Sequence, residues 1–328
     1  MLAVGPNGAG KTNLLEAVHL ATQGFSPRTR ADAELVRFGT AGARVAVQGT
    51  RHGTPFEVEL TIRPGEGKRA KLNGAALRTA EQLRAELPAL VFTPDRLVVV
   101  KGSPAARRAY FDRALARLLS SRSSLPVEYA AAVGQRNAAL RRVAARLSDS
   151  EALAPWTLQV AELGAALVTA REEAIAILAP AFAVKAAALG LPEGRLDYTG
   201  KLPTVEALEA RLQRDIDRGI TGLGPHLDDV GIRSGDRDLR SYGSQGEQRL
   251  AVLSLVLAEA DCLAERRGGG PLLLLDDVLS ELDRTRREAL VQLLPAQGQT
   301  LMTSTAADAL AVEPGQLLVV SHGRVRVG

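Results

Sequence analysis

The spacing of hydrophobic and polar positions divides this chain into three parts, of which the first mixes strands with a helix. Leu2–Val4 is an apolar stretch that predicts a buried strand, and residues 12–20 carry apolar positions at helical spacing. Residues 56–62 alternate between apolar and polar side chains, the pattern of a half-buried strand, and Asn73-Gly74 marks a hairpin turn. Shorter strand signals stand at 68–72, 90–92 and 97–100.

Helix signals dominate the second part, from about residue 103 to residue 189. Pro104, Pro126 and Pro155 each stand where a helix can begin, because the first helical turn tolerates proline. Residues 155–179 predict one helix of roughly 38 Å at 1.5 Å per residue. We expect Pro180 to end or kink this helix, because an interior proline removes a backbone hydrogen bond.

Strands and helices alternate again in the third part. Leu272–Leu275 is an uninterrupted apolar run, which is typical of a parallel strand covered on both faces. Further elements are expected as strands at 195–199 and 300–303, helices at 204–218, 250–263 and 284–294, and a terminal hairpin at 317–327. The chain therefore predicts one α/β body that a mostly helical lobe interrupts.

Composition narrows the class of protein. Hydrophobic residues make up 46% of the chain, enough for a sizeable core, whereas aromatic residues make up only 3%. So few aromatic side chains argue against base stacking as the main mode of binding single-stranded nucleic acid. The single cysteine, Cys262, excludes an intrachain disulfide, and no run approaches the roughly 20 apolar residues of a membrane span. We expect a cytoplasmic protein without a membrane partner.

Positive charge is unevenly distributed along the chain. The net charge is +4, yet residues 101–150 alone carry ten basic and three acidic residues. This asymmetry is typical of a polyanion-binding protein, although an arginine-rich solvated helix face would look the same. The spacing of Arg107-Arg108 and Asp112 favours salt bridges between them over contacts with DNA phosphates. Candidate DNA contacts on the first hairpin are Lys68, Arg69 and Lys71.

A phosphate-binding motif lies between the first strand and the first helix. Gly5-Pro6-Asn7-Gly8-Ala9-Gly10-Lys11-Thr12 matches G-x-x-x-x-G-K-[ST] at every position, and Asn13 follows it. The glycines let backbone N–H groups converge on phosphate oxygens at a helix N-terminus. In such a loop Lys11 reaches the β- and γ-phosphates of ATP, and Thr12 offers its hydroxyl to Mg²⁺.

The apolar strand Leu272–Leu275 is followed at once by Asp276 and Asp277. A carboxylate at the end of a buried strand lies at the edge of the sheet, where the phosphates of a P-loop protein bind. We expect Asp276 to hold Mg²⁺, directly or through water, and Asp277 to polarise the attacking water.

Two further motifs indicate the ABC class of ATPases. Ser244-Gln245-Gly246-Glu247 precedes a helix, and Ser280-Glu281-Leu282-Asp283 follows Asp277 closely. They resemble the signature motif and D-loop of that class, in which the signature serine and glycine close on a nucleotide held by the other protomer. By itself Ser244–Glu247 fits an ordinary helix N-cap better. The order of all four motifs favours the nucleotide site, with Lys11, Asp276, Asp277, Ser244 and Gly246 as the catalytic set.

With these motifs, the whole chain resembles the RecF family of bacterial recombination and repair ATPases. The residues that carry the resemblance are 5–17, 103–115, 224–229, 242–249 and 272–283. Residues 103–115 and 224–229 are the more diagnostic, because transporter ATPases differ there. The resemblance implies an ABC-type ATPase head, a mixed sheet with flanking helices, formed by residues 1–102 and 191–328. A mostly helical lobe, residues 103–190, would be inserted in it.

The same resemblance implies a function in recombinational repair and the rescue of replication gaps. ATP would join two protomers around double-stranded DNA or single-strand/double-strand junctions, and RecR with RecO would help to load RecA. Each site would combine Lys11 and Asp276 of one chain with Ser244 and Gly246 of the other. Hydrolysis would be weak and DNA-stimulated, and it would reset the dimer.

Several features depart from the patterns of related ATPases. The chain begins at the strand before the P-loop, where the family carries a β-hairpin, so we expect an adenine contact and a sheet edge to be missing. Leu227 stands where the family usually has arginine. A Q-loop glutamine near Asp95 and a switch histidine at Thr303–Thr305 are absent, which disfavours a transporter subunit. Asp277 replaces the usual glutamate and reaches less far, which predicts slow hydrolysis and leaves a nucleotide-gated scaffold as an alternative.

Overall fold

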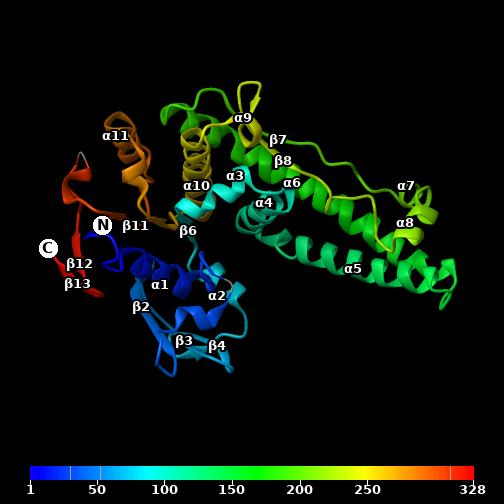
Figure 1. Cartoon of the computed structure of the whole chain (residues 1–328), viewed down its shortest axis with the longest axis horizontal. Coiled ribbons are helices and arrows are strands. Elements are labelled where there is room, and N and C mark those ends of the chain that lie inside the picture. The colour runs from blue at the N-terminus through cyan, green and yellow to red at the C-terminus, as the bar shows by residue number, and fades with distance from the viewer. Residues whose placement is uncertain (30, 52, 311) are drawn as a thin grey trace. The chain divides into compact units, whose positions relative to one another are not determined.

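The computed structural model describes residues 1–29, 31–51, 53–310 and 312–328 (Figure 1). Residue packing divides the chain into two compact units, one of residues 1–96 and 252–328 and one of residues 97–251. The expected head and lobe differ from these units mainly in residues 191–251. There β7 (Gly194–Tyr198) pairs with β8 (Val230–Ser234) and packs along α6 (Ala154–Ala188), so these strands join the helical unit.

A six-stranded sheet forms the centre of the first unit. Its strand order is β13-β12-β1-β11-β10-β6, and every neighbouring pair is parallel except β12 with β13. The strands are β1 (Leu2–Val4), β6 (Ala89–Phe92), β10 (Leu272–Leu275), β11 (Thr300–Ser304), β12 (Leu317–Ser321) and β13 (Arg324–Val327). Ala3, Val91, Leu274 and Leu301 pack with Leu15 in one buried cluster, as the apolar runs predict.

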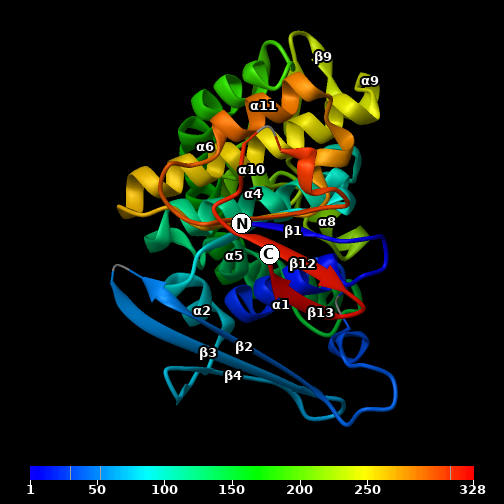
Figure 2. The same ribbon diagram turned by 90° about the vertical axis from the view of Figure 1, so that its left-hand side faces the viewer.

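A second, antiparallel sheet in the same unit packs on the helix that follows the P-loop. Its strands are β2 (Ala43–Arg51), β3 (Thr54–Arg63), β4 (Gly67–Leu72) and β5 (Ala75–Ala76), and Figure 2 shows the three longer ones side by side. The apolar face of β3 contacts α1 (Lys11–Gln23) and α2 (Ala80–Glu86). The expected alternation in residues 56–62 is confirmed, because Val58, Leu60 and Ile62 are buried, Phe56 is half-buried, and the polar positions between them are more exposed.

The second unit contains three long helices: α4 (Pro104–Leu118), α5 (Leu125–Ala144) and α6. The shorter elements are α3 (Val98–Lys101), α7 (Val205–Glu209), α8 (Leu212–Arg218), β9 (Arg237–Asp238) and α9 (Leu239–Tyr242). Helix α10 (Gln245–Arg267) begins in this unit and ends in the first, where α11 (Arg284–Leu293) follows. Within the described residues, none of the helices is both long and apolar enough to cross a membrane.

Two predictions of secondary structure were wrong, and a third was wrong in part. Residues 97–100 form a helical turn, closed by the Gly102 N–H on the Val98 carbonyl, because so short an apolar run carries no usable period. Of the two outcomes expected at Pro180, an end of the helix is wrong. Helix α6 continues through Pro180 to Ala188, since apolar side chains on both sides of the proline, such as Leu178 and Phe182, are buried. The helix expected at 204–218 is broken in two, because α7 packs on α6 whereas α8 packs on α5.

Candidate nucleotide-binding site

The P-loop joins β1 to α1 and is shaped by two glycines. Gly8 and Gly10 have φ values of 77° and 106°, which side-chain-bearing residues rarely adopt. The Lys11 side chain is only 8% exposed, and its ammonium group donates to the carbonyl oxygens of Gly5 at 2.7 Å and Pro6 at 3.0 Å. Pro6, Asn7 and Gly8 are exposed at the tip of the loop. The arrangement leaves a cation and a helix N-terminus at one exposed turn, which suits a phosphate group.

Asp276 lies beside the P-loop helix, as its position after β10 predicts. Its Oδ1 atom accepts hydrogen bonds from the hydroxyls of Thr12 at 3.1 Å and Thr303 at 2.7 Å. The Asp276 N–H donates to the carbonyl of Phe92 at 2.9 Å, which continues the ladder between β10 and β6. A hydroxyl from the P-loop and a carboxylate from β10 are therefore brought together across 264 residues of sequence.

These two oxygen donors fit the Mg²⁺ that a P-loop site implies. Mg²⁺ prefers oxygen ligands, and proteins commonly supply one or two of them while phosphates and water supply the rest. Across the described residues no group of three or more His, Cys, Asp or Glu side chains gathers as a metal site. Thr12 and Asp276 are the residues that would hold Mg²⁺ here.

Asp277 has a fixed backbone and an unengaged carboxylate. Its φ of 49° is left-handed, its N–H donates to the Thr303 hydroxyl at 2.8 Å, and its carbonyl accepts from the Ser280 hydroxyl at 2.9 Å. Within the described ranges, no hydrogen bond or ion pair engages the Asp277 carboxylate. That carboxylate is therefore free to accept a proton or to orient a water molecule.

The signature residues lie in the second unit, at the start of α10. The Ser244 hydroxyl accepts from the Glu247 N–H at 3.2 Å, and the Glu247 carboxylate accepts from the Ser244 N–H at 2.8 Å. Hydrogen bonds from Arg237 and from the Ser244 N–H hold the pKa of Glu247 below its ordinary value. Ser244, Gln245 and Gly246 are exposed. The N-cap interpretation is confirmed as local structure, and a nucleotide contact by these residues stays a prediction.

The D-loop residues also have local structural roles. Ser280 holds the carbonyl of Asp277, and Asp283 caps α11 by accepting from the Arg286 N–H at 2.9 Å. Both side chains remain exposed, and their part in a nucleotide site is likewise a prediction.

Two residues near the site were not assigned from the sequence. Thr303 contacts both Asp276 and Asp277. Its place at the switch-histidine position of related ATPases was a signal that it lies near the site, but the contact itself depends on the pairing of β10 with β11. Arg28 donates to Asn13 at 3.3 Å and to Glu16 at 3.2 Å, which holds a cation beside the first turn of α1. No spacing rule links Arg28 to the P-loop, because α1 ends before residue 28 and the loop that follows turns back toward the start of that helix.

The predicted pairing of Arg107-Arg108 with Asp112 was only partly right. Arg107 is 3% exposed and binds Asp229 through two hydrogen bonds of 2.7 and 2.6 Å, so its role is structural. Asp112 is held instead by Arg171, at 2.8 and 3.0 Å. Helix spacing predicts a local pair, but the tertiary fold supplies Arg107 with a partner 122 residues away.

The fold and the P-loop with its facing carboxylate define a P-loop ATPase head of the ABC type. The model of the RecF/RecN/SMC N-terminal domain matches residues 1–324. The chain is 36% identical to the DNA replication and repair protein RecF of Heliobacterium modesticaldum, over 99% of this chain and 91% of that protein. It is 38% identical to the RecF of Anaeromyxobacter dehalogenans, over 95% and 87%. The chain belongs to the RecF family.

Solved structures agree with this assignment. The recombination mediator protein RecF with ATP, of the RecFOR pathway, superimposes with a TM-score of 0.86 at 26% identity, covering 100% of this chain and 91% of that one. An Smc head bound to the C-terminal winged-helix domain of ScpA gives a TM-score of 0.59 at 16% identity, covering 100% and 88%, which supports the fold alone.

Proposed function

We propose that this protein is an ATP-dependent DNA-binding protein of DNA replication and repair. The observation that carries the proposal is the hydrogen bond from the Thr12 hydroxyl to Asp276. Next to Thr12, the Lys11 ammonium group is held against the P-loop by the Gly5 carbonyl oxygen. Relatives that carry the name DNA replication and repair protein, and a RecF structure that contains ATP, support it. The alternative of a transporter subunit lacks such support.

In this proposal Lys11 and the P-loop N–H groups bind the phosphates of ATP, and Thr12 with Asp276 holds Mg²⁺. Asp277 orients the attacking water, and its carboxylate is free to do so. Because an aspartate reaches less far than a glutamate, we expect turnover slower than the roughly 1–10³ per second common among enzymes. DNA stimulates this activity, and hydrolysis returns the protein to the DNA-free state.

Ser244 and Gly246 complete the site of a second copy, so that ATP joins two protomers. Both are exposed at the N-terminus of α10, where a hydroxyl, a bare N–H and a helix end favour an anion. Mixing two inactive variants, Lys11→Met and Ser244→Arg, tests this arrangement. In a shared-site dimer the mixed pair has one intact site and recovers part of the activity. If Ser244 acted on the nucleotide of its own chain, the mixture would stay inactive.

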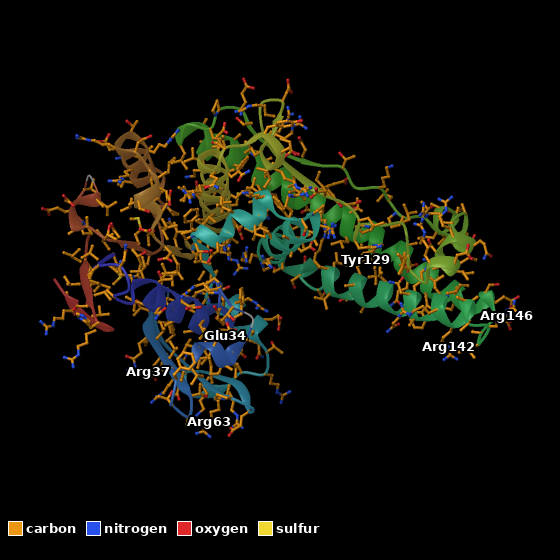
Figure 3. The ribbon with its side chains drawn as sticks, in the orientation of Figure 1. Glu34, Arg37, Arg63, Tyr129, Arg142 and Arg146 are labelled. Carbon is orange, nitrogen blue, oxygen red and sulfur yellow. The ribbon has the colours of Figure 1, made fainter. Side chains whose placement is uncertain are left out.

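The outer face of the antiparallel sheet is the surface that we propose for duplex DNA. Arg44, Arg63 and Arg69 have side chains that are 64%, 68% and 74% exposed, and Arg63 extends from this sheet in Figure 3. A hollow of about 230 Å³ lies between Arg63, Arg69 and Lys71. The exposed Glu66 pairs with Arg63 and Arg69, and the half-buried Glu59 pairs with the exposed Arg44. Ion pairs at the surface are weak, so phosphate groups can replace these carboxylates at little cost.

The test is the binding of labelled duplex DNA, measured by fluorescence anisotropy with ATP and with ADP. We expect tight binding only with ATP, and its loss in Lys11→Met. The exposed Lys201→Met is the matched control, and it should bind as the wild type does. Equal binding under all conditions would refute ATP-gated DNA binding and favour a nucleotide-gated scaffold. A weaker salt dependence in Arg63→Ala/Arg69→Ala would support the proposed surface.

The same proposal assigns the protein to the rescue of replication gaps with RecO and RecR, which load RecA. A structural neighbour is described as a recombination mediator protein of the RecFOR pathway, which supports this assignment. We expect RecR to bind the ATP-bound dimer more tightly than the monomer, a difference that analytical ultracentrifugation with ATP or ADP would detect.

A further inference from the structure

The buried hydroxyl of Thr303 lies on the strand between the one that leads into the P-loop and the one that leads into Asp276, and it has no part in the function proposed above. Thr303 is 0% exposed and stands at the carboxyl end of β11, the strand between β1 and β10. Leu275 of β10 is in register with Met302 of β11, so the next residues along each strand, Asp276 and Thr303, also meet. The strand order thus brings one side chain of β11 to the carboxylates that follow β10.

The Thr303 hydroxyl is engaged in both directions. It donates to Asp276 Oδ1 at 2.7 Å and accepts from the Asp277 N–H at 2.8 Å. Since a hydroxyl has a single proton, the donated bond goes to Asp276, which must accept it. Thr12 donates to the same Oδ1 atom, and no described residue hydrogen-bonds Oδ2. One oxygen of Asp276 is therefore held in place by two hydroxyls, while the other stays available.

The same hydroxyl fixes the peptide of Asp277. Its left-handed conformation, with φ 49° and ψ 30°, is unfavourable for a residue with a side chain. The N–H is held by Thr303 and the carbonyl by the Ser280 hydroxyl. Without the Thr303 hydroxyl, a partly buried N–H would lose its partner and the direction of the Asp277 side chain would be less defined.

We propose that Thr303 is a positioning residue for ATP hydrolysis, which orients Asp276 toward Mg²⁺ and Asp277 toward the attacking water through one shared hydroxyl. The inference rests on the proposed function, because it assumes that the site binds Mg²⁺ and ATP. It predicts that Thr303 affects the Mg²⁺-dependent part of nucleotide binding and the turnover number, but not the binding of nucleotide without metal.

The experiment compares Thr303→Val, which removes the hydroxyl at nearly constant volume, with Thr303→Ser, which keeps it. Thr300→Val, at the other end of the same strand, is the matched control. Binding of a fluorescent ATP analogue is titrated with Mg²⁺ and repeated in EDTA, and kcat and KM are measured separately. In Thr303→Val we expect the affinity for Mg²⁺ and kcat to fall about 10- to 100-fold, with binding in EDTA unchanged. Thr303→Ser and Thr300→Val should remain close to wild type.

The outcomes separate this inference from the function on which it rests. If the wild type binds no nucleotide with or without Mg²⁺, the proposed function fails and the inference fails with it. If the wild type binds Mg²⁺–ATP and folded Thr303→Val has the same Mg²⁺ dependence and kcat, only the inference is refuted. Should Thr303→Val not fold, Thr303→Ala is compared with Thr303→Ser, and equal behaviour of these two variants refutes it as well.

Discussion

Replacing Arg136 by methionine would test the most deeply buried ion pair of the second unit. Arg136 is 0% exposed and Asp215 is 1% exposed. Arg136 Nη1 donates to Asp215 Oδ2 at 2.9 Å and to the Thr221 hydroxyl at 2.9 Å, and Nε donates to the Thr157 hydroxyl at 3.2 Å. The pair therefore ties α5, α6 and α8 together at one end of the unit.

The size of the effect follows from what Arg136→Met leaves behind. Asp215 would keep the Gly222 N–H at 3.2 Å and the distant Arg211 guanidinium at 4.0 Å, but it would lose its main cation while still buried. Removing one partner of such a pair costs about 3–5 kcal/mol of unfolding free energy. Arg142→Met is the control, because Arg142 is an exposed residue near the end of the same helix (Figure 3), and should change stability by less than about 0.5 kcal/mol.

Trp156 provides a local assay. It is the single tryptophan of the chain, and it precedes Thr157, which accepts the Arg136 hydrogen bond. Urea unfolding followed by tryptophan fluorescence therefore reports on this end of the unit. A loss of less than about 1 kcal/mol in Arg136→Met would refute the reasoning. The double variant Arg136→Met/Asp215→Leu should recover most of the loss, because it removes the unpaired charge as well.

Three further predictions concern the P-loop, a helix and the signature segment. Gly5→Ala should displace the P-loop, because the new Cβ would lie 2.2 Å from the backbone oxygen of Val320. The rise in melting temperature that ATP produces should then disappear, and an unchanged rise would show that the loop tolerates the methyl group. Gly134→Ala should raise stability by about 0.5–1 kcal/mol, since Gly134 lies in α5 with open space around the new methyl group, and urea unfolding would reveal a loss if this space were needed. Hydrogen bonds lower the pKa of Glu247 from its ordinary value of 4.5. The ionised side chain therefore stabilises the fold fully above pH 4.5, and this stabilisation is lost as the pH falls through the lowered pKa. Glu247→Gln should therefore lower stability at neutral pH, and this loss should shrink as the pH falls through the lowered pKa. A loss that stays the same in acid would contradict the assignment.

The local motifs of the site could be predicted from the sequence. The P-loop needs only a strand, a glycine-rich turn and a helix that follow one another within about twenty residues, so a contiguous pattern determines it. The same holds for β10, whose unbroken apolar run indicates a strand covered on both faces, and for the carboxylates that follow it. The caps of α7 and α11, Thr204 and Asp283, are equally local, because a cap acts on its own next turn.

Only the tertiary structure decided which of these segments are neighbours. The strand order β1-β11-β10 brings Thr303 to Asp276, and nothing in the spacing of residues 276 and 303 encodes that order. Arg107 has its partner 122 residues away, so helix spacing suggested the wrong carboxylate. Residues 97–100 became a helical turn, because the burial of Val99 and Val100 outweighed the strand propensity of valine. Sequence patterns determine local conformation through backbone and side-chain preferences, whereas pairing across the chain depends on which surfaces are buried together.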